Sequence, residues 1–125
     1  MALEPGLAAE IVLAVSEADT ALALGSGDVE VLGTPRVIAL CEEASIRAIE
    51  SRLEPGCTSV GSRVQLDHLH PTAVGRKVRA ESRLERVEGR RLTFSVAVHD
   101  DRGLVAAGKL TRVIVETDRF LDKAT

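Results

Sequence analysis

Apolar and polar residues alternate near the start of the chain with the two-residue period of a β-strand. From Leu7 to Ser16, one side of the pattern is formed by Leu7, Ala9, Ile11, Leu13 and Val15. This alternation predicts a strand with one buried face. The following segment, 18–33, contains three glycines and has no clear period, so we expect a connection with at most one short helical turn.

The period lengthens to that of a helix from Thr34 to about Leu53. Thr34 is a favourable N-cap, and Pro35 fits the first helical position, where a missing N–H removes no hydrogen bond. The helix is expected to end before Glu54-Pro55-Gly56. The pattern therefore predicts one long helix whose first turn is capped by the Thr34 hydroxyl.

Beyond the helix, alternating segments joined by turn residues predict an antiparallel sheet. We expect strands over 58–70, 74–87, 90–99 and 104–116, with tight turns at 88–89 and 100–103. Inward-facing positions are expected at Leu92, Phe94, Val96 and Val98 in one strand, and at Val60, Val64, Leu66, His68 and His70 in another. The charged tail, 117–125, is expected to be peripheral and frayed.

The order of these elements predicts a single domain, 1–125, of the α+β class. A lone helix must bury its apolar stripe, and an antiparallel sheet can bury one face while the other stays in water. A sheet wrapped around the helix satisfies both requirements. We therefore expect a hot-dog fold, with a five- to six-stranded antiparallel sheet around one long helix.

The composition narrows the possible functions. Apolar residues make up 45% of the 125 positions, and the net charge of −3 comes from interspersed acidic and basic residues. Because there is no basic patch with interleaved aromatic residues, nucleic acid is not expected as a partner. No basic residue precedes Arg36, so neither a signal peptide nor a membrane partner is expected. Cys41 and Cys57 lack metal-site spacing and predict reduced cysteines in a cytoplasmic protein.

Two adjacent carboxylates in the helix fall on different faces. At about 100° per residue, Glu43 groups with Arg36 and Arg47, and its spacing to Arg47 suits a weak surface ion pair. Glu42 lies within about 20° of Ile49 and Leu53 on the apolar arc. A carboxylate there costs free energy unless it is paired, hydrogen-bonded or protonated. Glu42 is therefore either a functional group, or a residue at the edge of the stripe that reaches water, or one that makes a structural hydrogen bond.

Thr34 and His68 each allow two interpretations, one structural and one functional. Thr34 can serve only as a cap, or it can lie in a site, because the preceding Gly33 lets a substrate approach the backbone. His68 shares the face that meets the helix, where it is either a satisfied core residue or a functional group, whereas His70 beside Pro71 is expected to be exposed.

Several motifs together resemble the fluoroacetyl-CoA thioesterase branch of the hot-dog thioesterases, across roughly 15–116. They are L-G-T-P-R-V-I-A-L-C-E, L-E-P-G, H-L-H-P-T, and V-E-G-R-R-L followed by V-H-D. That branch carries a catalytic Thr, a Glu eight positions later and a His twenty-six positions after the Glu. These spacings fall on Thr34, Glu42 and His68.

The resemblance implies further properties. It points to Gly61 as a close-approach position near the acyl group, with a strand bulge as the alternative, and to Arg112 as a contact to coenzyme A, with an exposed strand charge as the alternative. The last strand reads Gly108-Lys109-Leu110-Thr111-Arg112 where the family has G-x-H-x-R. The lid stretch, 25–30, lacks the phenylalanines of the fluoroacetate-specific enzyme, so the resemblance does not imply fluoroacetyl specificity.

The function that we expect is hydrolysis of a small or medium acyl-CoA by a homodimer, which could pair further into a dimer of dimers. The resemblance implies Thr34, Glu42 and His68 as catalytic residues and Gly33, Gly61 and Arg112 as substrate-binding residues. It implies no metal or redox cofactor, since coenzyme A is part of the substrate. The main alternative is a non-catalytic acyl-CoA-binding hot-dog module, and a hot-dog hydratase is a third possibility.

Overall fold

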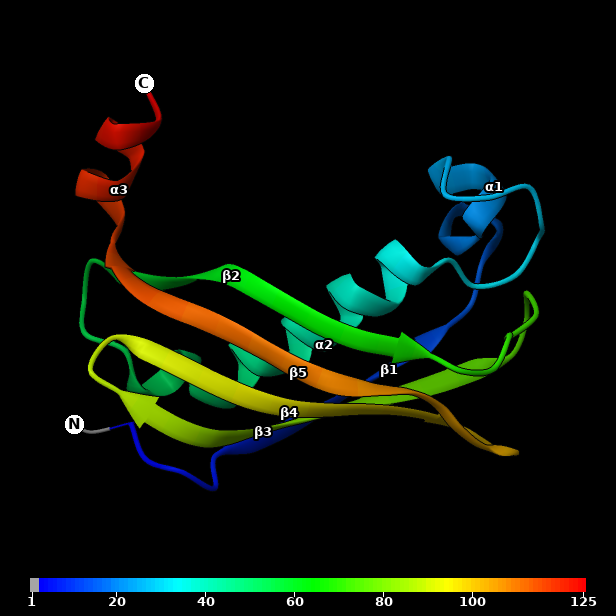
Figure 1. Ribbon diagram of the computed structural model, residues 1–125, viewed down its shortest axis with the longest axis horizontal. Helices are drawn as coiled ribbons and strands as arrows, with labels where there is room; N and C mark the ends of the chain where they lie inside the picture. Colours follow the sequence, from blue (N-terminus) through cyan, green and yellow to red (C-terminus); the bar gives the residue numbers. More distant parts are fainter. Residues whose placement is uncertain (1–2) are drawn as a thin grey trace.

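Five antiparallel strands form one sheet that curves around a long helix in the computed structural model (Figure 1). The structure describes residues 3–125. The sheet order is β1-β3-β4-β5-β2, with β1 at Ala8–Ala14, β2 at Cys57–His68, β3 at Lys77–Glu88, β4 at Arg91–Asp100 and β5 at Gly103–Glu116. The helices are η1 (Glu17–Asp19), α1 (Ala21–Leu24), α2 (Thr34–Ile49), η2 (Glu50–Arg52) and α3 (Thr117–Ala124). This arrangement confirms the predicted α+β hot-dog fold.

The core lies between α2 and the concave face of the sheet. The helix buries Val37, Leu40, Cys41 and Ala44 completely or almost so. Opposite them, all four inward positions predicted for β4 are buried, namely Leu92, Phe94, Val96 and Val98. Because side chains alternate across a strand, the period-2 pattern was sufficient to identify this face.

A β-bulge in β2 changes which residues face the helix. The register with β5 shifts between Gly61 and Arg63, so one extra residue is inserted at this point. Ser59 is buried before the bulge, whereas Leu66 and His68 are the more buried residues after it. The prediction that Val60 shares a face with His68 is therefore wrong, because the extra residue reverses the parity of the strand.

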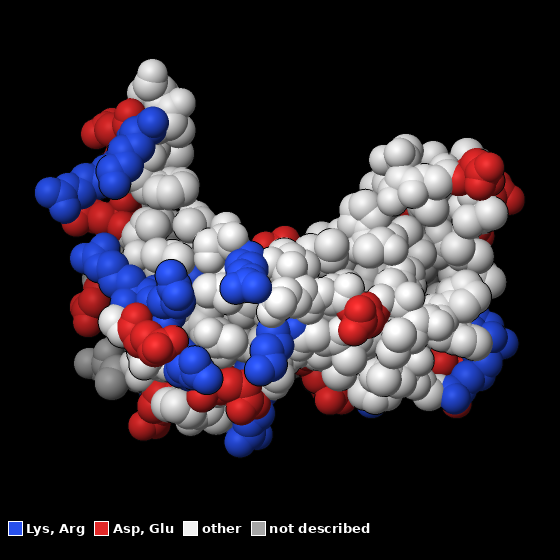
Figure 2. Space-filling model, in the orientation of Figure 1, with Lys and Arg blue, Asp and Glu red and all other residues white. Residues whose placement is uncertain are grey.

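The segments before α2 and after β5 project from the body of the molecule. The connection 15–33 contains η1 and α1, and α3 extends the end of β5, so the two project on the same side (Figure 1). The predicted frayed tail is instead the regular helix α3, although its residues Phe120 and Leu121 are exposed. Figure 2 shows a saddle between these two projections, formed mainly by uncharged residues. None of the helices in residues 3–125 is long and apolar enough to cross a membrane.

Candidate functional site

Thr34 and His68 meet where α2 begins and β2 ends. The Thr34 Oγ1 lies 2.8 Å from the His68 Nδ1, a hydrogen-bonding distance between side chains that are 34 residues apart in the sequence. The other ring nitrogen, Nε2, is buried and has no hydrogen-bond partner among the described residues. If the neutral ring carries its proton on Nε2, the Nδ1 accepts the hydroxyl proton of Thr34. The pair then has the arrangement of an alcohol beside a general base.

Burial lowers the pKa of His68 below its usual value near 6.5, and a backbone hydrogen bond involving His70 opposes the shift. The apolar surroundings disfavour the charged imidazolium. The imidazole is therefore mostly neutral at pH 7 and can take a proton. His70 is exposed, as its place beside Pro71 predicted.

The start of α2 differs from the prediction, because the Thr34 hydroxyl does not cap the helix. Gly33 is the N-cap, and Thr34 is the first helical residue and makes no capping bond. The prediction of a Thr34 cap is therefore wrong, and the hydroxyl is bonded to His68 instead. The Gly33 N–H donates to the Asp19 carbonyl at 2.9 Å, while the Thr34 N–H has no acceptor among the described residues. That N–H can donate to a substrate carbonyl oxygen at the helix start.

A hollow of about 290 Å³ opens next to this pair, between the α1 segment and the end of β2. Besides Thr34 and His68, its lining includes the aliphatic residues Ala21, Val29, Val31 and Leu69. Gly33 also lines it, and a Cβ at that position would lie 3.0 Å from Leu24 and 3.1 Å from the Ala21 backbone. Glycine at 33 therefore allows α1 to pack closely against the start of α2.

Glu42 belongs to a second polar cluster, midway along α2. Its Oε2 accepts a hydrogen bond of 3.1 Å from the Arg112 Nη1, and the Glu42 side chain is 33% exposed. Arg112 is only 5% exposed and also donates from Nε to the Ser59 Oγ at 2.9 Å and from Nη2 to the Ser59 carbonyl at 2.8 Å. The alternative of an exposed strand charge is therefore wrong for Arg112, because the guanidinium is buried.

Gly61 faces this cluster from β2. A Cβ at Gly61 would lie 2.5 Å from the Glu42 Oε2 and 3.5 Å from the Arg112 Nη1. Gly61 also borders the bulge that was the alternative predicted for it. The neighbour that makes a close approach to it here is the carboxylate of Glu42.

The two adjacent glutamates have different partners. Glu43 is 48% exposed and pairs at 3.5 Å with Arg36, two turns earlier on the same face of the helix, and not with Arg47 as its spacing suggested. Arg36 is shared, since its Nε also lies 3.0 Å from Asp19 in η1. The buried face of α2 is also rotated relative to the predicted one, because Ile46 is 38% exposed while Val37 and Ala44 are fully buried. Glu42 thus lies on the flank of the helix that faces β2.

The clusters of Thr34–His68 and of Glu42–Arg112 are separate within one chain. Eight residues of α-helix rise about 12 Å, which is more than a glutamate side chain can span. The structure therefore brings together Thr34 with His68, and Glu42 with Gly61 and Arg112, but not the two groups with each other. Ser59 was not anticipated, because its inward direction follows only from the bulge.

The thiol of Cys41, next to Glu42 in the sequence, belongs to neither cluster. Cys41 is buried, and burial, together with the charge of Glu42, raises its pKa to about 12, so the thiol is not a nucleophile at neutral pH. Within residues 3–125, His, Cys, Asp and Glu form no group of three or more able to hold a metal ion.

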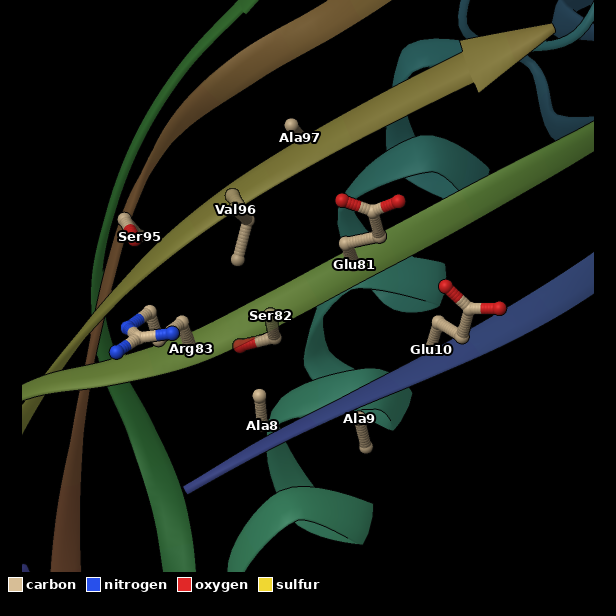
Figure 3. A pocket seen from close by; sticks show the side chains of 9 residues that line it. All are labelled: Ala8, Ala9, Glu10, Glu81, Ser82, Arg83, Ser95, Val96 and Ala97. Carbon is tan, nitrogen blue, oxygen red and sulfur yellow. The ribbon is translucent and has the colours of Figure 1, made fainter. Parts of the chain in front are cut away.

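A larger hollow, of about 590 Å³, lies on β1, β3 and β4 (Figure 3). Its carboxylates, Glu10 and Glu81, lie 3.6 and 3.0 Å from the Arg79 Nε. Its buried hydroxyl, on Ser82, is 2.7 Å from the Ser45 hydroxyl in α2. These groups are paired within the fold and do not converge on a ligand position.

Comparisons with known proteins point to one family. Residues 15–118 match the family model described as fluoroacetyl-CoA-specific thioesterase. The fluoroacetyl-CoA thioesterase of Streptantibioticus cattleyicolor is 34% identical over 91 residues, which are 73% of this chain and 66%, just under two thirds, of that protein.

Solved structures agree over a longer span. A fluoroacetyl-CoA thioesterase structure has a TM-score of 0.93 and 28% identity, covering 99% of this chain and 96% of the other. A hot-dog-like protein from Thermanaerovibrio acidaminovorans has a TM-score of 0.88 and 28% identity, with 96% and 89% covered.

Proposed function

Since this chain belongs to the family of fluoroacetyl-CoA-specific thioesterases, we propose that it hydrolyses an acyl-CoA thioester to a carboxylate and free coenzyme A. Water supplies the oxygen of the carboxylate, the C–S bond breaks, and the sulfur leaves as the thiol. The observation that carries this proposal is the 2.8 Å contact between Thr34 and His68 at an apolar hollow.

His68 acts as the general base in this reaction. The attacking oxygen is the Thr34 hydroxyl or a water held by it, and in both cases the His68 Nδ1 takes its proton. If the hydroxyl attacks, an acyl-Thr34 ester forms as the C–S bond breaks, and a water activated by His68 then hydrolyses the ester to the carboxylate and restores the hydroxyl. The Thr34 N–H stabilises the negative charge that develops on the thioester oxygen. The proton then passes to the leaving sulfur, so that no net charge remains on the ring.

Glu42 completes the site from a second copy of the chain. Within one protomer it lies too far along α2 to reach His68, so its part in the reaction requires a dimer in which the Glu42 of the partner subunit approaches the Thr34–His68 pair. The free edge of the twelve-residue strand β2 suits such pairing. Ile46 and Val64, 38% and 43% exposed, add apolar area on the same side.

The substrate is a coenzyme A thioester of a small aliphatic acid. A related structure from the same family holds fluoroacetate and coenzyme A, which supports the coenzyme portion. The hollow of about 290 Å³, with its aliphatic lining, suits a short acyl chain. Fluoroacetyl specificity is not part of the proposal, because 25–30 contains no aromatic residue.

Thiol release from a panel of acetyl-, butyryl-, benzoyl- and palmitoyl-CoA tests the proposal. Hydrolysis should be fastest for the short aliphatic thioesters, and His68→Ala should lower kcat by about 10²–10⁴-fold, the usual contribution of a general base. Glu42→Gln should be similarly impaired, with Glu43→Gln as the matched control at wild-type rate. Thermal protection by acyl-CoA without any hydrolysis would instead identify a binding module.

A further inference from the structure

We propose that Ser59 and Arg112 are positioning residues that hold the Glu42 carboxylate in its reactive orientation, with Gly61 providing the space for it. This inference rests on the proposed function, in which Glu42 takes part in thioester hydrolysis. It assigns a role to Ser59 and replaces the expected coenzyme contact of Arg112 with a different one.

The guanidinium of Arg112 is fixed on two sides. It donates from Nε and Nη2 to the hydroxyl and the carbonyl of Ser59, and from Nη1 to Glu42. These bonds use three of its five N–H donors in a planar group that cannot rotate without breaking them. With 5% of its surface exposed, Arg112 is not available to reach a coenzyme outside the sheet.

Glu42 lies against Gly61 as well as against Arg112. The backbone of Gly61 does not have a positive φ, so a glycine is required there for space and not for conformation. A methyl group at this position would lie 2.5 Å from the Glu42 Oε2 and would displace the carboxylate from Arg112. The β-bulge next to Gly61 allows Ser59 and Gly61 to face the helix together on this part of β2.

This arrangement leaves one carboxylate oxygen for chemistry. Oε2 is held by Arg112, whereas no hydrogen bond to Oε1 is found among the described residues. The side chain is one-third exposed, so Oε1 can meet a substrate or a water while its partner oxygen stays fixed. Loss of the ion pair between Arg112 and Glu42 would leave the buried guanidinium without its counter-charge and the Glu42 carboxylate free to move.

The kinetic constants distinguish positioning from coenzyme binding. A lost contact to coenzyme A weakens substrate binding and raises KM, whereas a misplaced carboxylate lowers kcat. A displacement of about 1 Å in a reacting group can cost about 100-fold in rate. Arg112→Lys keeps the positive charge but replaces the planar guanidinium and its several N–H donors with a single ammonium group, which cannot hydrogen-bond to Ser59 and Glu42 at once.

The experiment measures kcat and KM with acetyl-CoA for Ser59→Ala, Arg112→Lys and Gly61→Ala. The matched controls are Ser95→Ala, at a half-buried position on the outer face of β4, and Arg91→Lys, at an exposed position. We expect kcat to fall about 3–10-fold for Ser59→Ala and about 10–100-fold for the other two, with KM changed less than about threefold, and no change in the controls. Ser59→Ala in a Glu42→Gln background should have no further effect, because the group that it positions is already lost.

Two results would overturn the inference. One is a KM that rises at least tenfold for Arg112→Lys with kcat unchanged, which would assign Arg112 to coenzyme binding. The other is an unchanged kcat for Ser59→Ala, the mildest variant, which decides the matter even if the other two fail to fold in circular dichroism melts. A wild-type protein that hydrolyses no acyl-CoA would contradict the proposed function itself, which separates the two failures.

Discussion

Two polar clusters flank the same helix, and they differ in almost every physical respect. Thr34 and His68 form a neutral pair at the exposed start of α2, where the imidazole can exchange protons near neutral pH. Glu42, Arg112 and Ser59 form a charged set halfway along α2, with the guanidinium buried. The first cluster is suited to moving a proton, and the second to holding a fixed negative charge.

The comparison shows how one small domain can separate these tasks. A carboxylate in contact with the imidazole would raise the pKa of the ring. Within one chain, the rise of about 12 Å along α2 between Thr34 and Glu42 keeps the carboxylate away from His68. Each cluster joins α2 to a strand by a direct contact, Thr34 to His68 in β2 and Glu42 to Arg112 in β5. In the proposed function, a complete site therefore depends on how two chains meet.

The largest predicted effect tests whether the clusters act across two subunits. Co-expression of a His68→Ala chain and a Glu42→Gln chain under different affinity tags yields mixed dimers with one intact site. We expect such a dimer to recover about half of the wild-type activity, while each parent homodimer is almost inactive.

The matched control places both substitutions on one chain and pairs it with a wild-type chain. With shared sites, this dimer has no intact site and stays inactive. If it kept half of the activity instead, each chain would carry its own site and the proposed role of the partner's Glu42 would be wrong.

The next effect concerns the first cluster alone. Thr34→Ala removes the hydroxyl bonded to His68, and we expect kcat to fall about 10–10³-fold, while Thr34→Ser keeps the hydroxyl and stays within about tenfold of wild type. Steady-state kinetics with acetyl-CoA checks both variants. Equal activity of the alanine and serine variants would show that the hydroxyl has no part in the reaction.

A smaller effect follows from the lowered pKa of His68. The neutral ring is the active base, so kcat/KM should be constant above the ring pKa and fall as the pH drops through it. Burial alone lowers this pKa, so the midpoint should lie below 6.5 for Glu42→Gln, which lacks the carboxylate, whereas the partner's Glu42 should raise the midpoint of the wild type above that of the variant. Profiles of kcat/KM against pH with acetyl-CoA measure both midpoints, and a wild-type midpoint no higher than that of Glu42→Gln would argue against a carboxylate beside the ring.

The smallest predicted effect uses a third polar contact on α2 that has no part in either cluster. The Ser45 Oγ lies 2.7 Å from the Ser82 Oγ and donates to the Cys41 carbonyl at 2.8 Å, all within the core. Ser82→Ala should lower the free energy of unfolding by about 1 kcal/mol in urea titrations and leave kcat unchanged. A large loss of kcat without loss of stability would place this contact in the catalytic machinery.

Much of the fold follows from local patterns. Period-2 alternation identified the buried face of β4, and the change to a helical period located α2 to within a few residues at its C-terminal end. The separation of Glu42 from Glu43 by helical angle also agrees with their environments, since Glu43 is in water with Arg36 and Glu42 is against β2. These features depend on backbone geometry, which repeats along the chain.

The departures arise where a long-range contact competes with a local one. Thr34 was expected to cap its own helix, but its hydroxyl contacts His68 and Gly33 takes the cap position. The face of Val60 was wrong because a single inserted residue reverses the alternation, and the strand was predicted without the bulge that Gly61 had suggested as an alternative. The role of Ser59 depends on the same insertion.

By itself, the sequence determined the hot-dog architecture, the core face of β4 and the separation of Glu42 from Glu43 on α2, because these follow from periodicity and turn chemistry. Only the tertiary structure decided which groups the side chains of Thr34 and Glu42 contact. Thr34 contacts the imidazole of His68, and Glu42 contacts the buried guanidinium of Arg112, which Ser59 holds in place. Hydrogen bonds and ion pairs join atoms that are 34 and 70 residues apart, and their geometry exists only once the sheet has curved around the helix.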